Sequence, residues 1–175
     1  MRKNIILIFV ALALICSCSG KDKTAADWTA KEKALWDGQK YTNPEKAIEY
    51  LDKAIKLQPN NPELYNKKGT AYYNMGQYQH TIEMTSEAIR LMPKYFLAYN
   101  NRGNSFANLG QFQKAIEDYN QVISLKPDFS VAYDSRGTIH LLTGNKDMGC
   151  RDVKKACELG NCRKMEEARS KGYCP

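Results

Sequence analysis

The sequence has few of the patterns that catalytic and metal sites usually need. Its 175 residues include only two histidines, His80 and His140, and neither has a serine, cysteine or aspartate at a spacing typical of a catalytic triad. It contains no glycine-rich phosphate-binding loop and no CxxC-like pair of cysteines. We therefore expect a protein that is not an enzyme and that needs no cofactor and no metal.

The sequence also lacks an alternating strand pattern, and it has one long apolar run, from Ile5 to Ile15. Arg2 and Lys3 precede this run and small residues follow it, which is the order of a secretory signal peptide. The run is shorter than the roughly 20 residues that span a bilayer. We expect residues 1–17 to act as a signal peptide and to direct export.

The segment Ile15-Cys16-Ser17-Cys18 resembles a bacterial lipobox. The resemblance implies that Cys18 carries acyl chains at the mature N-terminus and that residues 18–27 form a tether. Cys16 fits the pattern less well, because Ile15 would then occupy the small-residue position. The alternative is an ordinary cleavage near Ser19 or Gly20 without a lipid. The expected location is the cell envelope, on the periplasmic face of the outer membrane.

A lattice with a period of 34 residues runs through the rest of the chain. A repeat of this length predicts helical hairpins that stack into a solenoid, which is an architecture for binding rather than for chemistry. The small residues of the lattice would let helices approach closely, and its aromatic residues would fill the space between hairpins. The recurring residues are Gly69, Gly103 and Gly137; Tyr65, Tyr99 and Tyr133; Pro59, Pro93 and Pro127; and Leu57, Leu91, Leu125 and Leu159.

These residues resemble the tetratricopeptide repeat (TPR) pattern, which is clearest in Tyr99, Gly103, Phe106, Ala115 and Tyr119. The resemblance implies an all-α, right-handed solenoid of about four hairpins plus a C-terminal capping helix. The expected units are a degenerate repeat at 28–61, repeats at 62–95 and 96–129, a repeat-like unit at 130–163 and a disulfide-stapled cap at 164–175. In the first unit, Asn43 and Pro44 are typical of a helix start.

In TPR proteins the first helix of each hairpin lines the concave face, and the resemblance therefore implies a set of peptide-binding positions. Their amides can both donate to and accept from the backbone of an extended peptide. Lys67, Arg102 and Arg136 flank this row and would meet an acidic group of the ligand. The row consists of Asn66, Thr70, Tyr73, Asn74, Asn100, Asn104, Asn108, Asp134 and Thr138.

Four cysteines, Cys150, Cys157, Cys162 and Cys174, lie close together near the C-terminus. They allow three pairings, and a final helix that returns antiparallel after Gly160 favours Cys157–Cys162 and Cys150–Cys174. An oxidising compartment favours disulfides over a zinc site or a redox-active dithiol. The segment around Cys157 also resembles the cysteine-containing Sel1-like repeats, which usually have a longer interval between their cysteines.

The basic residues are scattered among acids except in the tail, where Tyr173 is the one nearby aromatic side chain. This pattern does not favour a nucleic acid as partner. We expect a scaffold or adaptor that is anchored to a membrane by its lipid and binds a protein or peptide. Two alternatives remain open: a secreted, disulfide-rich Sel1-like effector or thiol protein, and a structural envelope protein that self-associates.

Overall fold

The computed structural model describes residues 23–175, and these residues form nine α-helices and one isolated β-bridge between Trp36 and Tyr41. The expected signal peptide and Cys18 lie outside the described residues. No helix of residues 23–175 is both long and apolar enough to cross a membrane. The helices are α2 (Ala25–Lys33), α3 (Pro44–Leu57), α4 (Pro62–Asn74), α5 (Tyr78–Leu91), α6 (Phe96–Asn108), α7 (Phe112–Leu125), α8 (Ser130–Leu142), α9 (Lys146–Glu158) and α10 (Arg163–Ser170).

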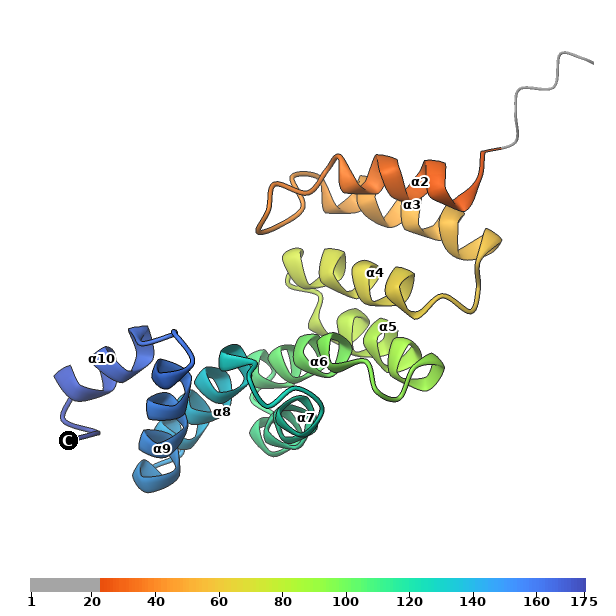
Figure 1. The fold of residues 1–175 in the computed structure, drawn as a ribbon. Coiled ribbons are helices and arrows are strands. Elements are labelled where there is room, and N and C mark those ends of the chain that lie inside the picture. The colour runs from red at the N-terminus through yellow and green to blue at the C-terminus, as the bar shows by residue number, and fades with distance from the viewer. Residues whose placement is uncertain (1–22) are drawn as a thin grey trace, which may run out of the picture.

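The first eight of these helices pair into four hairpins, α2–α3, α4–α5, α6–α7 and α8–α9, and α10 packs on α9. Each hairpin contacts mainly the next one along the chain, so the stack is extended, with the first hairpin and α10 at opposite ends (Figure 1). This arrangement confirms the all-α solenoid with a capping helix.

The start of α3 agrees with the capping residues predicted from the sequence, and the start of α2 requires a correction. Asn43 accepts a hydrogen bond from the backbone N–H of Lys46, and Pro44 opens α3, as predicted. However, α2 begins at Ala25, within the segment that we expected to be a tether. Thr24 and Asp27 form a reciprocal capping box that fixes this earlier start.

The recurring glycines allow the two helices of a hairpin to pack closely. A Cβ atom added to Gly103 would lie 3.0 Å from Cε1 of Tyr119, and one added to Gly137 would lie 2.9 Å from Cβ of Asp152. Tyr119 is almost completely buried between the helices. These contacts confirm that the recurring glycines serve packing and that Tyr119 fills space between the helices.

The recurring tyrosines and prolines are hydrogen-bond partners across the boundary between hairpins. Tyr65 donates its hydroxyl to the carbonyl of Pro59 at 2.9 Å, and Tyr99 donates to the carbonyl of Pro93 at 3.3 Å. A proline cannot continue a helix, and in these two cases its carbonyl accepts from the next unit. The two residue types therefore keep the same period.

Two disulfides hold the C-terminal cap. Cys150 pairs with Cys174, with Cα atoms 5.5 Å apart, and Cys157 pairs with Cys162, with Cα atoms 3.9 Å apart. These are the two pairs that the antiparallel return of the chain favoured. Because Cys162 is the last residue before α10, the second disulfide ties the start of this helix to the end of α9. The cap covers the apolar end of the last hairpin.

Candidate functional site: the concave face

Polar side chains of α2, α4 and α6 bond to one another across the concave face. Lys67 of α4 donates to Glu32 of α2 at 2.7 Å. One repeat later, Asn101 of α6 donates to Oδ1 of Asn66 of α4 at 2.9 Å. In both cases the residue after the predicted binding position reaches back to the preceding hairpin. These bonds link successive hairpins, and they occupy part of the predicted binding row.

At the N-terminal end of this face, Glu32 is almost completely buried and both of its carboxylate oxygens are bonded. It accepts from the hydroxyl of Tyr41 and from the ammonium of Lys67. Burial and the neighbouring carboxylate raise the pKa of Tyr41, which therefore stays a neutral donor. A cavity of about 380 Å³ opens here beside Trp36. The polar groups of Glu32, Tyr41 and Lys67 in its wall are already hydrogen-bonded to one another.

The predicted binding residues in the middle of the face also have partners within the protein. Oδ1 of Asn104 accepts from the hydroxyl of Tyr119 at 2.7 Å, and Asn108 donates to the hydroxyl of Tyr73 at 3.0 Å. Asn74 accepts from the backbone N–H of Tyr41 at 2.9 Å and so holds the loop of the first hairpin. Of these residues, Tyr73 and Asn108 also line a groove, which is described below.

The structure corrects the roles expected for Arg102 and Arg136. Arg102 makes two hydrogen bonds to the buried carboxylate of Asp118, at 2.9 and 2.8 Å, and bonds Ser86 of the preceding hairpin. Arg136 likewise makes two bonds to Asp152, at 2.7 and 2.8 Å. Both guanidinium groups are therefore committed to contacts with the second helices of the hairpins, so they do not face a ligand on the concave side.

Two predicted residues, one in α6 and one in α8, differ from the others. Asn100 and Asp134 are 8% and 9% exposed, and the Oδ1 atom of each has no hydrogen-bond partner within residues 23–175. Burial raises the pKa of Asp134 above its ordinary value. At the place where Lys67 and Asn101 reach back to the preceding helix, α8 has the short Ser135. No repeat follows α8 to supply such a donor to Asp134.

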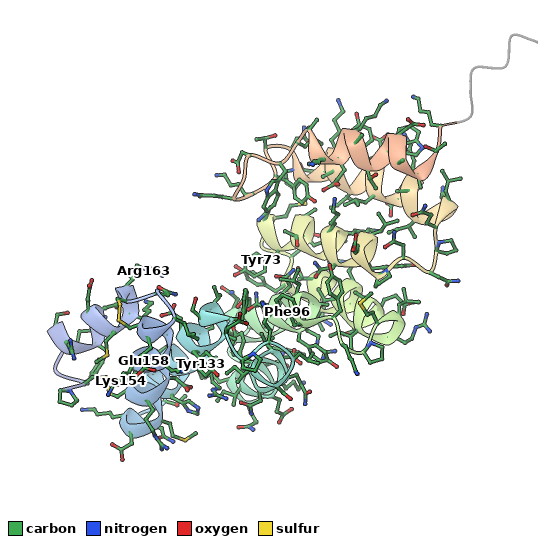
Figure 2. All side chains as sticks on the ribbon, viewed as in Figure 1. Tyr73, Phe96, Tyr133, Lys154, Glu158 and Arg163 are labelled. Atoms are coloured by element: carbon green, nitrogen blue, oxygen red, sulfur yellow. A yellow bond between two sulfur atoms is a disulfide. The ribbon has the colours of Figure 1, made fainter. Side chains whose placement is uncertain are left out.

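A groove of about 540 Å³ opens beside Asp134, between α6, α8 and α10. Leu142, at the end of α8, lines this groove and is 71% exposed to solvent. Arg163 and Lys164 form the opposite wall, and Figure 2 shows Arg163 at the start of α10 and Tyr73 at the end of α4. The groove is lined by Tyr73, Ala107, Asn108, Phe112, Tyr119, Asp134, Ser135, Thr138, Ile139, Leu142, Arg163 and Lys164. We call it the C-terminal groove.

Sequence reasoning missed the contribution of α10 to this groove. From the sequence, Arg163 and Lys164 belong to a basic tail that is not part of the predicted binding row, because α10 lies outside the 34-residue pattern. The signal was the disulfide that directly precedes Arg163, since it fixes where the returning helix begins. The face thus has an N-terminal part whose polar groups are paired and a C-terminal part with unpaired groups and a groove.

The residues that could serve catalysis or metal binding are not brought together. His80 stacks on Tyr72 with ring centroids 5.0 Å apart, whereas His140 is buried in α8, where desolvation lowers its pKa. Within residues 23–175, no group of three or more histidine, cysteine, aspartate or glutamate side chains could hold a metal ion.

Comparison with known proteins places the chain among repeat proteins. Models of the tetratricopeptide repeat match residues 43–76, 62–95 and 96–129. The crystal structure of MamA is 31% identical, with a TM-score of 0.71 over 84% of this chain and 81% of that one. Residues 41 to the end of MamA from Desulfovibrio magneticus are 22% identical, with a TM-score of 0.71 over 79% and 77% of the two chains.

A third similar structure is the first TPR domain of Spaghetti (RPAP3), bound to an HSP90 peptide. It is 22% identical, with a TM-score of 0.65 over 69% of this chain and 96% of that one, and this likeness shows the fold alone. A search of curated protein sequences found no match.

Proposed function

Because the chain belongs to the tetratricopeptide repeat family, we propose that it is an interaction scaffold that binds an extended peptide segment of a partner protein on its concave face. The observation that carries this proposal is the C-terminal groove, where the unpaired Oδ1 atom of Asp134, an exposed leucine and two cationic side chains meet. Peptide-binding sites usually combine polar groups that bond to the peptide backbone with apolar contact area. A TPR domain of the same fold holds a peptide of HSP90, which supports this choice of ligand class.

The proposal narrows the predicted binding row to one end. Asn66, Asn74 and Asn104 already accept hydrogen bonds within the protein, so a ligand would have to displace these bonds. Asp134 and Thr138 line the C-terminal groove, together with Tyr73 and Asn108. Tyr73 and Asn108 already bond to each other, so Asp134 and Thr138 are the two predicted positions that a ligand can reach in this groove without breaking a contact between α4 and α6.

The test is cross-linked capture of partners, with the wild type beside Leu142→Asp. Leu142 is 71% exposed, so the variant should fold normally but should place a charge in the groove. The matched control is Leu57→Asp, because Leu57 is 53% exposed at the end of α3 and does not line this groove. A partner lost with Leu142→Asp and kept with Leu57→Asp supports the proposal. A partner kept with both places the binding surface elsewhere.

The lipid anchor is a separate part of the proposal. Cys18 follows Ile15 and Ser17 in a lipobox-like order, and several acyl chains on one residue would hold the scaffold stably at a membrane. Such an anchor would concentrate the repeat domain at the periplasmic face of an envelope membrane, where it would recruit its partner. Mass spectrometry of the mature N-terminus tests this part, because acyl chains on Cys18 support it and an unmodified N-terminus rejects it.

A further inference from the structure

We propose that the C-terminal groove selects acidic peptides, in which a carboxylate meets Arg163 and a neighbouring apolar side chain packs on Leu142. This inference rests on the proposed peptide-binding function and specifies the ligand of the same groove. It assigns the capping helix α10, which lies outside the repeats, a role in specificity. Three features of the groove carry it: an unpaired guanidinium, an unpaired buried acceptor and an exposed apolar side chain.

The first feature is the charge of the wall formed by α10. Lys164 and Lys171 both bond to Glu167, at 2.8 and 2.6 Å, and these two ammonium groups lower the pKa of Glu167 to about 2. Arg163 is exposed and has no ion pair or side-chain hydrogen bond within residues 23–175. Glu167 is thus shared by two lysines, and Glu166, the other glutamate of α10, forms no ion pair with Arg163 within residues 23–175, so the guanidinium of Arg163 is left for a ligand.

The position of these cations in the helix strengthens the argument. Arg163 and Lys164 are the first two residues of α10, and Cys162 before them makes no side-chain capping bond. Cations at a helix N-terminus lie at the positive end of the helix dipole, which is unfavourable. A ligand carboxylate between Arg163 and the first turn of α10 would offset the repulsion between the cations and the helix dipole. It would also accept hydrogen bonds from the uncapped N–H groups of this turn.

The second feature is Asp134, which is nine-tenths buried, lines the same groove and has no partner for its Oδ1 atom. The charged groups that act on it are Arg163, Lys164 and Glu167. The two cations would repel a cationic ligand group, so the donor that suits Asp134 is an uncharged main-chain N–H. A peptide supplies such N–H groups next to its carboxylates, whereas a polyphosphate would meet the repulsion of Asp134 without supplying a donor.

The third feature is the apolar surface between these two polar sites. Leu142 is largely exposed, and Phe112 and Ile139 also line the groove. An apolar ligand side chain would remove part of this surface from water and contribute about 25 cal/mol per Å² of apolar area. The expected ligand is therefore an extended peptide with an aspartate or glutamate close to a leucine, isoleucine or phenylalanine.

The disulfide between Cys157 and Cys162 acts as a positioning element for this site. It links the end of α9 to the residue just before Arg163, so it fixes where α10 begins and where the guanidinium lies. The other disulfide holds the far end of the cap through Cys174. Specificity for acidic peptides should therefore depend on the Cys157–Cys162 bond even when the repeats stay folded.

An array of immobilised octapeptides of varied composition tests the inference, probed with the wild type, Arg163→Glu and Arg151→Glu. The last variant is the matched control, because Arg151 is exposed on α9, undergoes the same change of charge and does not line the groove. The wild type and Arg151→Glu should bind peptides that combine acidic and apolar residues. Arg163→Glu should bind the same peptides about tenfold more weakly, the loss expected for one charged contact.

The outcomes separate the inference from the proposed function. Peptides that are neutral or basic, or acidic peptides that Arg163→Glu binds as tightly as the wild type, would overturn the inference and leave peptide binding in place. Binding to none of the peptides by any of the three proteins would reject both. Fluorescence polarisation titrations then compare the affinity of a selected peptide with that of an analogue in which glutamine replaces its glutamate. The two peptides differ only in this carboxylate.

Discussion

Asn66 and Asp134 occupy the same place in their repeats, yet their side chains have different surroundings. Asn66 is bonded by Asn101 of the following hairpin. Asp134 has no such donor within the described part of the chain, because α8 belongs to the last hairpin and α10 follows a different geometry. In a solenoid, a unit can complete the hydrogen bonds of the preceding one, and no repeat follows α8 to do so for Asp134, which leaves its Oδ1 atom available for a ligand.

The two parts of the concave face consequently differ in what they contribute. The N-terminal part contributes stability through paired polar groups, as in the bonds of Glu32 to Tyr41 and Lys67. The C-terminal part contributes unpaired groups and exposed apolar area, which are costly in a free protein and useful in a complex. Substitutions that alter one part at a time should therefore separate the two contributions.

The largest loss of stability should follow from Glu32→Ala. The substitution leaves the Tyr41 hydroxyl buried without its acceptor and leaves Lys67 without its counter-ion, which should cost about 3 kcal/mol of unfolding free energy. Urea denaturation measures it, and Glu49→Ala is the control, because Glu49 pairs with Lys53 on an exposed surface. A loss for Glu32→Ala no larger than that of the control would contradict a stabilising N-terminal part.

The double substitution Cys157→Ser, Cys162→Ser should have the next largest effect. Opening this short loop should lower the unfolding free energy by about 2 kcal/mol, and the start of α10 should lose its fixed position. The control is a thiol titration of the parent protein, residues 23–175, denatured without reduction. It should find no free cysteine. Two titratable thiols in the parent would contradict the two-disulfide arrangement.

Asp134→Asn should stabilise the free protein at neutral pH, by about 1 kcal/mol. Burial raises the pKa of Asp134 in the folded state above that of the unfolded chain, so the cost of its charge is absent at low pH and appears as the pH rises through the folded pKa. The stability difference between variant and wild type should therefore grow with pH over this interval and then level off. Thermal melts at several pH values measure this trend, and a difference independent of pH would contradict a buried, unpaired carboxylate.

The smallest change in stability should come from Leu142→Asp, within about 0.5 kcal/mol of the wild type, because the side chain is largely exposed. The same variant should lose peptide binding. Thermal melts and peptide titration on one preparation measure both quantities. A large loss of stability would show that Leu142 is structural, which would remove it from the proposed binding surface.

The sequence was sufficient to predict the fold because its 34-residue period reports packing directly. Gly103 recurs as Gly69 and Gly137, since each of these positions lies against the second helix of its hairpin, where a Cβ atom would be crowded. The same periodicity did not reveal which side of a helix Arg102 faces. Its partner Asp118 lies sixteen residues ahead, and Asp152 lies at the same interval from Arg136. This repeated pair of opposite charges was the signal that indicated structural roles for both arginines.

The candidate site was less predictable, because a binding row deduced from equivalent positions treats every repeat alike. Whether Asn66 or Asn100 is available depends on what the next hairpin donates, and this is decided by single differences such as Asn101 against Ser135. Arg163 lines the groove because the Cys157–Cys162 disulfide holds the start of α10 beside the end of α9. Both facts concern the end of the array, where a periodic pattern carries no information.

Site-specific photo-cross-linking tests the central claim, that the C-terminal part of the concave face is the binding surface, most directly. A photoreactive amino acid replaces Leu142 in one protein and Trp36 in another, since both side chains are exposed beside cavities at opposite ends of the face. The account predicts that a partner peptide is cross-linked from position 142 and not from position 36. Cross-linking from position 36 alone would contradict it and would place the ligand at the N-terminal end.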